Sequence, residues 1–308
     1  MKLIFNSKYT PVIAIFVAMI IWASSFIALK IAFRSYHPMV VIFGRMLIAT
    51  LCFMVFYKYV FKGFKYHKGD YKPLLFMAFC EPCLYFIFEA IALKNTSASQ
   101  AGVITATAPI FILAAASLFL KEKYNLQSWL GALAALAGVC WITLASATSE
   151  SAPNPIFGNF CEVLAMACAT GYTVCLKSLT KRYSPLFLTS TQALMGTFFY
   201  LPMLFLPFVE MPTEYVALPS FAIIYLGAVV SLIAYGLYNY ALAHMPAAQG
   251  ASYINLIPIF SVAMAWLFLG ETLNLSQGFA AALIIASVWV SQKGMAKAHD
   301  EKHSLKNK

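Results

Sequence analysis

Long apolar stretches alternate with short polar links along the whole chain. Ten of these stretches are long enough to cross a bilayer core of about 30 Å. Because lipid offers the backbone no hydrogen-bond partner, each of them must be a helix. The pattern therefore predicts an all-α integral membrane protein. Its ten expected spans are residues 10–31, 38–61, 73–94, 98–120, 126–146, 156–179, 185–208, 217–243, 247–269 and 274–292.

The apolar pattern occurs twice, at a separation of 149 residues. Residues 108–126 read APIFILAAASLFLKEKYNL and residues 257–275 read IPIFSVAMAWLFLGETLNL. Earlier positions match at a separation of 147 residues, as at Tyr36 and Tyr183. Each half then holds five spans, and because five is odd we expect the second half to be inverted in the membrane, as in many secondary transporters. The expected units are a first five-helix repeat at 1–149, an inverted repeat at 150–296 and a basic cytoplasmic tail at 297–308.

Composition and charge place the spans in a membrane and orient them. Hydrophobic residues make up 62% of the 308 residues and charged residues 10%, which leaves too little polar surface for a soluble domain. Because positive loops stay cytoplasmic, we expect both termini in the cytoplasm and a multi-pass protein of the cell (inner) membrane. The formal charge of +10 then indicates contact with anionic lipid and not with nucleic acid. The basic residues expected on the cytoplasmic side are Lys2, Lys8, Lys58, Lys62, Lys65, Lys68, Lys72, Lys121, Lys123, Lys177, Lys181, Arg182, Lys293, Lys297, Lys302, Lys306 and Lys308.

Short motifs occur along the chain in a fixed order, and the proline-to-glutamate motif among them occurs in both halves. They are Trp22-Ala-Ser-Ser-Phe26, His37-Pro38 with Gly44-Arg45, Pro109 followed by Leu120-Lys-Glu122 and Gly131, and Pro258 followed by Leu269-Gly-Glu271. In this order they resemble the drug/metabolite transporter (DMT) superfamily, specifically its EamA-type members with ten helices in two inverted halves. The resemblance covers residues 11–292 and departs from the pattern at Gln192, which stands opposite Arg45 in the second half.

The resemblance implies a secondary transporter that exports or exchanges small organic metabolites such as amino acids. A multidrug or cationic-compound exporter is the alternative within transport. A membrane-embedded enzyme or a signalling protein is the alternative outside it, but an enzyme would need a convergent nucleophile or metal set. The expected partners are a small-molecule substrate and the lipid bilayer, with the protein a monomer or a homodimer.

The sequence offers no motif for catalysis or for a cofactor. Cys80-Glu-Pro-Cys83 has the CxxC spacing of redox and metal sites, but it lacks both a βαβ context and a second ligand pair. No glycine-rich phosphate loop and no HExxH motif occurs in the sequence. We therefore expect no enzymatic activity, no catalytic residues, no cofactor and no metal site.

Prolines and glutamates recur at equivalent points of the two halves. Pro109 and Pro258 lie inside spans, where each removes a backbone hydrogen bond and kinks the helix. The freed carbonyls either line a cavity or accompany a kink that serves packing alone. Glu122 and Glu271 follow the same spans, and we interpret them as polar caps between antiparallel helices. Small residues in spans 5 and 10, such as Gly131, predict close packing of those helices.

Four charged residues fall inside the expected spans and away from their ends: Arg45, Glu81, Glu89 and Glu162. Arg45 and Glu89 lie at similar depth on consecutive helices, so we predict a structural charge pair that offsets the cost of either charge in lipid. Snorkelling of Arg45 to the interface is the alternative.

Glu81 lies near the middle of span 3, where burial disfavours its charged form. An intramembrane acid at this depth is a functional candidate, so we predict a coupling residue or a partner for a substrate amine; a protonated acid bonded to a neighbouring helix is the alternative. Tyr85 follows it on roughly the same face. The residues expected to bind substrate in a central cavity are Trp22, Ser25, Glu81, Tyr85, Tyr235, Asn239, Tyr253 and Asn255.

Overall fold

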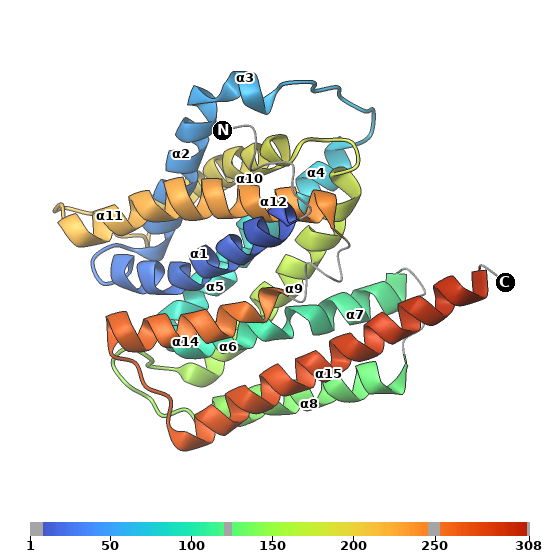
Figure 1. The fold of residues 1–308 in the computed structure, drawn as a ribbon. Helices are drawn as coiled ribbons and strands as arrows, with labels where there is room; N and C mark the ends of the chain where they lie inside the picture. The colour runs from blue at the N-terminus through green and yellow to red at the C-terminus, as the bar shows by residue number, and fades with distance from the viewer. Residues whose placement is uncertain (1–8, 120–124, 246–252, 307–308) are drawn as a thin grey trace.

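The computed structural model describes residues 9–119, 125–245 and 253–306, and the elements it contains there are helices (Figure 1). The α-helical elements are α1 (Thr10–Ala32), α2 (Pro38–Val55), α3 (Tyr57–Val60), α4 (Tyr71–Ala78), α5 (Tyr85–Asn95), α6 (Ala98–Ile104), α7 (Ala108–Phe119), α8 (Leu126–Leu144), α9 (Pro155–Leu179), α10 (Pro185–Tyr200), α11 (Ala217–Tyr225), α12 (Tyr235–His244), α14 (Leu256–Leu269) and α15 (Leu275–Lys306). Four segments have other helical geometry: η1 (Phe79–Leu84) and η4 (Leu226–Ala234) are π-helical, whereas η2 (Thr105–Thr107) and η3 (Pro202–Phe205) are 3-10 helices.

Seven helical stretches in the described residues are long and apolar enough to cross a membrane, so the expected all-α, multi-pass fold is confirmed at this level. They are Thr10–Phe33, Pro38–Val55, Tyr71–Asn95, Ala98–Ala115, Leu126–Leu144, Pro155–Leu179 and Ala217–His244. The other three expected spans correspond to shorter pieces. α10 ends at Tyr200 just before Pro202, a residue that cannot donate to the preceding turn. α14 and the apolar part of α15, Leu275–Ser291, are also short.

Helices α8 and α15 lie side by side along one edge of the molecule (Figure 1). A Cβ atom built at Gly131 of α8 would lie 2.7 Å from the carbonyl oxygen of Ser287 in α15. A Cβ atom at Gly138 would lie 2.6 Å from the side chain of Ile284. Glycine is therefore required for this contact, which confirms the close packing predicted from small residues in spans 5 and 10.

Most of the remaining contacts join the two halves of the chain. α1 packs against α12, η4, α11 and α14, which all come from the second half. α9 packs against α4, η1, α5 and α7, which all come from the first half. α2 packs against α10 and η4. The buried core therefore lies between the halves and not within either one.

The expected proline kinks coincide only in part with the irregular backbone. Pro109 follows the 3-10 segment η2 at the start of α7, and Pro258 lies in the first turn of α14, where its missing N–H costs no intrahelical bond. Larger irregularities occur in η1 and η4. In η1, Glu81 has extended backbone angles (φ −148°, ψ 116°) and the Glu81–Pro82 peptide is cis. η4 contains no proline.

Glu271 caps a helix from the other half of the chain. Its Oε1 accepts a hydrogen bond from the backbone N–H of Ala98 (3.1 Å) and its Oε2 accepts one from the N–H of Ser99 (2.9 Å). These are two of the N–H groups that the start of α6 leaves without an intrahelical partner. Glu122, the expected counterpart, lies outside the described residues.

Candidate substrate cavity

A cavity of about 60 Å³ lies where the two halves meet, and most of the residues that we expect to bind substrate lie in its wall. Five of the eight residues expected to bind substrate line it: Trp22, Ser25, Glu81, Tyr85 and Tyr235. The charged residues Arg45 and Glu89 line it as well. The lining comes from α1, α2, the η1–α5 break, the η2–α7 junction, α9, α12 and the start of α14.

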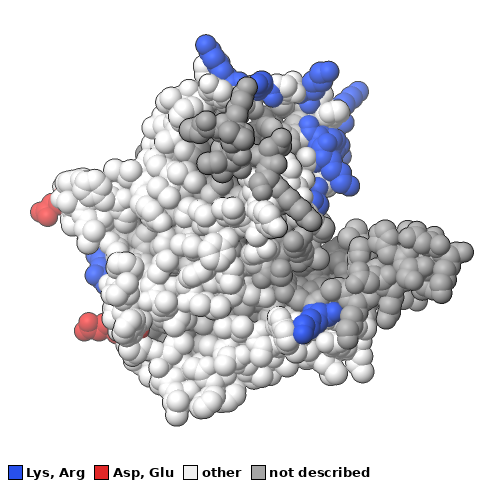
Figure 2. All heavy atoms as spheres, viewed as in Figure 1, with Lys and Arg blue, Asp and Glu red and all other residues white. Residues whose placement is uncertain are grey.

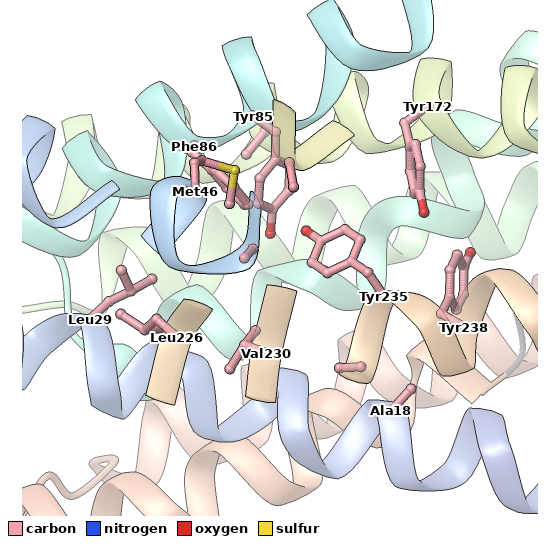
Figure 3. Close-up of a cluster of buried hydrophobic side chains, with 14 of the residues drawn as sticks. Ala18, Leu29, Met46, Tyr85, Phe86, Tyr172, Leu226, Val230, Tyr235 and Tyr238 are labelled. Atoms are coloured by element: carbon pink, nitrogen blue, oxygen red, sulfur yellow. The ribbon is translucent and has the colours of Figure 1, made fainter. Parts of the chain in front are cut away.

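Glu81 reaches the cavity because the helix is broken at its position. Its Oε1 accepts a hydrogen bond from the hydroxyl of Tyr235 in α12. Figure 3 shows the hydroxyls of Tyr85 and Tyr235 pointing toward one another across the same space. Both acid and tyrosine are buried, so the carboxylate is held by the protein and not by bulk water.

Two side chains of α10 hold the broken segment in place. Gln192 Nε2 donates to the carbonyl of Glu81 (3.1 Å), and the Tyr200 hydroxyl lies 3.1 Å from the carbonyl oxygen of Pro82 and 2.5 Å from that of Cys83. A carbonyl left open in a membrane interior costs several kcal/mol, roughly, unless it finds such a donor. Gln192, which aligns with Arg45 in the second half, therefore stabilises the helix break at Glu81.

Arg45 and Glu89 are brought together beside the cavity. Arg45 Nη1 lies 3.8 Å from Glu89 Oε2, its Nε donates to Ser231 Oγ in η4 at 2.7 Å, and its Cζ lies 4.0 Å from the centre of the Phe86 ring. Tyr85 donates to the other carboxylate oxygen of Glu89 at 3.1 Å. Arg45 is only 2% exposed, so its guanidinium lies inside the protein and does not reach the interface as the snorkelling alternative requires.

Aromatic rings form the rest of the wall near Glu81. The ring of Trp22 lies 5.0 Å from that of Tyr235 and 4.7 Å from that of Tyr238, and Tyr172 stacks on Tyr238 at 6.4 Å. Ring faces carry partial negative charge, and together with a carboxylate they attract a cationic group.

Three of the expected residues do not line the cavity. Asn239 lies one turn beyond Tyr235, where it accepts from the Tyr172 hydroxyl (2.6 Å) and donates to Thr189 (2.8 Å). It therefore positions a wall residue and is not itself in the wall. Tyr253 and Asn255 precede α14, and a turn at Asn255 gives the cavity positions to their neighbours Ile254 and Ile257.

The sequence could have indicated some of the wall residues that were not foreseen. Tyr238 lies three positions after Tyr235 on the same helix, and Tyr172 and Thr173 continue a helical stripe that begins at Met166. Thr105 and Ala108 face the cavity because η2 changes the helical phase, and the sequence gives no local signal of that change. The unforeseen lining residues are Phe26, Thr105, Ala108, Met166, Ala169, Tyr172, Thr173, Tyr238, Ile254 and Ile257.

The CxxC motif lies within the broken helix segment η1. Among the described residues, no three His, Cys, Asp or Glu side chains are close enough to hold a metal ion. Cys80 and Cys83 are both buried and are not joined in a disulfide. Both belong to the broken segment that positions Glu81.

Comparison with protein families gives a match over nearly the whole chain. The EamA-like transporter family matches residues 10–144 and, a second time, residues 156–292. The chain is also similar in fold to a protein of known crystal structure, with a TM-score of 0.64 over 92% of this chain and 97% of that one. At 15% identity this second likeness shows the fold alone.

Individual relatives are similar over most of their length. An "uncharacterized transporter" of Archaeoglobus fulgidus is 27% identical over 96% of this chain and 99% of its own. The transporter YetK of Bacillus subtilis is 25% identical over 80% of this chain and 76% of its own. A "probable terminal-alkyne amino-acid exporter" of Streptantibioticus cattleyicolor is 24% identical over 84% of this chain and 85% of its own.

Proposed function

Because this chain belongs to the EamA-like transporter family, we propose that it exports or exchanges small organic metabolites such as amino acids by alternating access. That the chain is a multi-pass membrane transporter follows from the family and from its apolar helices. The substrate class and the mechanism are the proposal. The observation that supports them best is a cavity between the halves whose wall includes both Glu81 and Arg45.

An amino acid presents two opposite charges, and the cavity offers a partner for each. Its ammonium group would bind Glu81 among the rings of Trp22 and Tyr235, which attract a cation. Its carboxylate would bind Arg45, whose Nη1 has no hydrogen-bond partner among the described residues. The amino-acid exporter among the relatives supports the same class.

The mechanism requires two halves that can exchange poses, and cross-half contacts support that arrangement. We propose ten spans in two inverted five-helix repeats, 1–149 and 150–296. Arg45 of the first half bonds Ser231 in η4, and Gln192 of the second half bonds the carbonyl of Glu81 in η1. Arg45 and Gln192 are 147 residues apart, which is the separation that aligns the halves.

Charge supports the proposed orientation, with both termini and the 297–308 tail in the cytoplasm of the cell membrane. Figure 2 shows most of the basic side chains at the top and right of the molecule, whereas the acidic side chains lie at the left with one smaller basic patch between them. The lysines of the 58–72 link are exposed, and so are Glu210 and Glu214 in the equivalent link after α10. A monomer or a homodimer in contact with anionic lipid completes the proposal.

A multidrug or cationic-compound exporter is the second candidate, and the aromatic wall favours it. Trp22, Tyr235, Tyr238 and the carboxylate of Glu81 suit an organic cation that has no carboxylate of its own. Such a substrate would not contact Arg45, which would stay paired with Glu89.

Efflux from proteoliposomes tests both candidates. Vesicles that contain the purified chain are loaded with radiolabelled L-amino acids, or with tetraphenylphosphonium as the cation, and loss of label is compared with protein-free vesicles. Arg45→Lys separates the two, because it keeps a positive charge but not the planar fork that pairs with a carboxylate. Amino-acid efflux that Arg45→Lys impairs supports the first candidate, and cation efflux that the change leaves intact supports the second. No efflux of either class would overturn the proposed substrates.

A further inference from the structure

The side-chain amide of Gln192 in α10 is satisfied at one end only. Its Nε2 donates to the carbonyl of Glu81 at 3.1 Å, whereas its Oε1 has no hydrogen-bond partner among the described residues. Because only an N–H group can face that carbonyl, the orientation of the amide is fixed, and Oε1 is the end left without a partner. The residue is 4% exposed, and a buried amide oxygen that accepts no hydrogen bond is costly. We therefore searched the surroundings for a donor to Oε1.

The hydroxyls near Gln192 have already given their protons to other acceptors. Thr189, one turn earlier on α10, donates to the carbonyl of Pro185 at 2.9 Å. Tyr172 of α9 also approaches Gln192, but its hydroxyl donates to Asn239 Oδ1 at 2.6 Å. A hydroxyl has a single proton, so neither group can serve Oε1 as well. The donor is therefore a molecule bound beside Gln192.

A small second pocket beside Gln192 has room for such a molecule. It lies where the irregular segments η1 and η4 meet α2 and α10, and its volume is about 10 Å³. Gln192, Ser231 and Tyr235 supply polar groups to its wall, and Met46 and Phe86 supply apolar ones. A space of roughly 10–15 Å³ is the least that holds a water molecule, so the pocket fits one water and no larger ligand.

Two further polar groups of the wall are open to a water molecule. Ser231 Oγ accepts from Arg45 Nε at 2.7 Å, and its own proton goes to no acceptor among the described residues. The hydroxyl of Tyr235 gives its proton to Glu81, which leaves its oxygen free to accept. With Gln192 Oε1, the wall then offers one donor and two acceptors, and a buried water makes about three hydrogen bonds. A metal cation does not suit this place, because the guanidinium of Arg45 adjoins it.

We propose that this pocket is a binding site for one water molecule, which donates to Gln192 Oε1 and Tyr235 Oη and accepts from the Ser231 hydroxyl. The water completes a chain between the two charged groups of the larger cavity, because Tyr235 bonds Glu81 and Ser231 bonds Arg45. It thereby holds the carboxylate and the guanidinium in a fixed relation to one another. The inference goes beyond the proposed function, since it holds whatever the substrate is.

X-ray hydroxyl-radical labelling of the purified full-length protein tests the site without any substrate. A brief exposure converts water into hydroxyl radicals, which oxidise the side chain that the water touches, and methionine becomes its sulfoxide. Met46 lines the small pocket and is 2% exposed, so its labelling reports a bound water. Met77 of α4 is 0% exposed and lines neither this pocket nor the larger cavity, so it is the matched control. Met46 should be labelled more strongly than Met77.

Two variants remove the water in different ways. Gln192→Leu takes away the acceptor, whereas Ala193→Val fills the pocket from its wall and keeps every polar group. In both, peptide mass spectrometry should show that the excess labelling of Met46 over Met77 is lost. Met166, in the wall of the larger cavity, should be labelled as in the wild type. If Gln192→Leu does not fold, because the break at Glu81 has lost a donor, Ala193→Val still decides.

The outcomes separate this inference from the transport proposal. Equal labelling of Met46 and Met77 in the wild type overturns it, whether or not the protein transports amino acids. An excess at Met46 that persists in a folded variant of either kind also overturns it, because the radicals then come from another source. Loss of the excess with Met166 unchanged supports the water site even if no substrate of the tested panel moves.

Discussion

Thr50 of α2 and Thr197 of α10 share a hydrogen bond, with their Oγ1 atoms 2.9 Å apart. Their positions differ by 147 residues, which is the separation that aligns the two halves of the sequence. In a pair of units related by a two-fold axis, equivalent residues touch each other only where the axis passes between them. The contact therefore supports two inverted repeats whose axis runs between α2 and α10.

A disulfide between these two positions tests the axis. In a variant whose native cysteines are replaced, Thr50→Cys with Thr197→Cys should form a disulfide on mild oxidation, because bonded sulfur atoms need only about 2 Å between them. Peptide mass spectrometry gives the yield. Phe198, the next residue of α10, is 64% exposed, so Thr50→Cys with Phe198→Cys is the matched control and should not cross-link. Equal yields for the two pairs would contradict the arrangement.

Sidedness of the two equivalent links tests the inversion itself. In intact cells, a cysteine in place of Met211, in the link after α10, should react with a membrane-impermeant thiol reagent. A cysteine in place of Lys65, in the link after α2, should react only after the membrane is permeabilised. Both residues are exposed, so a difference reports the side and not burial. Reaction of both from the outside, or of neither, would refute inverted halves.

Removal of either member of the Arg45–Glu89 pair should destabilise the protein. Each alanine variant leaves a buried charge without its partner, and such losses reach about 3–5 kcal/mol in the free energy of unfolding. The double variant should lose less than the sum, with a coupling of about 0.5–3 kcal/mol. Equilibrium unfolding in mixed micelles measures all four proteins. Strictly additive losses would mean that the 3.8 Å approach contributes no interaction energy.

The helices were predictable because lipid permits few structures, whereas the faces they present were not. An apolar run of sufficient length must be helical in a membrane, so α1, α8 and α9 begin within a residue of where the hydrophobic pattern places them. Trp22 and Glu81 were found because a polar or aromatic residue deep in a span has few reasons to be there.

The depth of a polar residue in a span did not decide which side chains reach the cavity. Tyr235 and Asn239 lie one turn apart in α12, but only Tyr235 lines the cavity, because Asn239 is bonded to Tyr172 and Thr189. Those partners lie on other helices, far away in the sequence, so the pattern around Asn239 gives no signal of them. The role of Gln192 was equally hidden, since its partner is a carbonyl exposed only by the break at Glu81.

The cavity acid gives the most direct test of the transport mechanism. Glu81→Gln keeps the shape of the side chain but can neither hold a substrate ammonium by charge nor exchange a proton. Efflux of radiolabelled amino acids from proteoliposomes should therefore fall by at least about tenfold, the factor that corresponds to about 1.4 kcal/mol of lost interaction. Folding should survive, because an amide can still accept the hydrogen bond from Tyr235, and a melting curve in detergent checks this for each variant.

Two control variants define what a loss of transport in Glu81→Gln means. Tyr235→Phe removes the hydroxyl that bonds Glu81 and keeps the ring against Trp22, so it should reduce efflux less than Glu81→Gln does. Glu214→Gln removes an exposed carboxylate of the link after α10 and should leave efflux unchanged. Parental efflux by Glu81→Gln at every pH tested would make Glu81 a satisfied buried acid, with the substrate amine held by the aromatic wall alone.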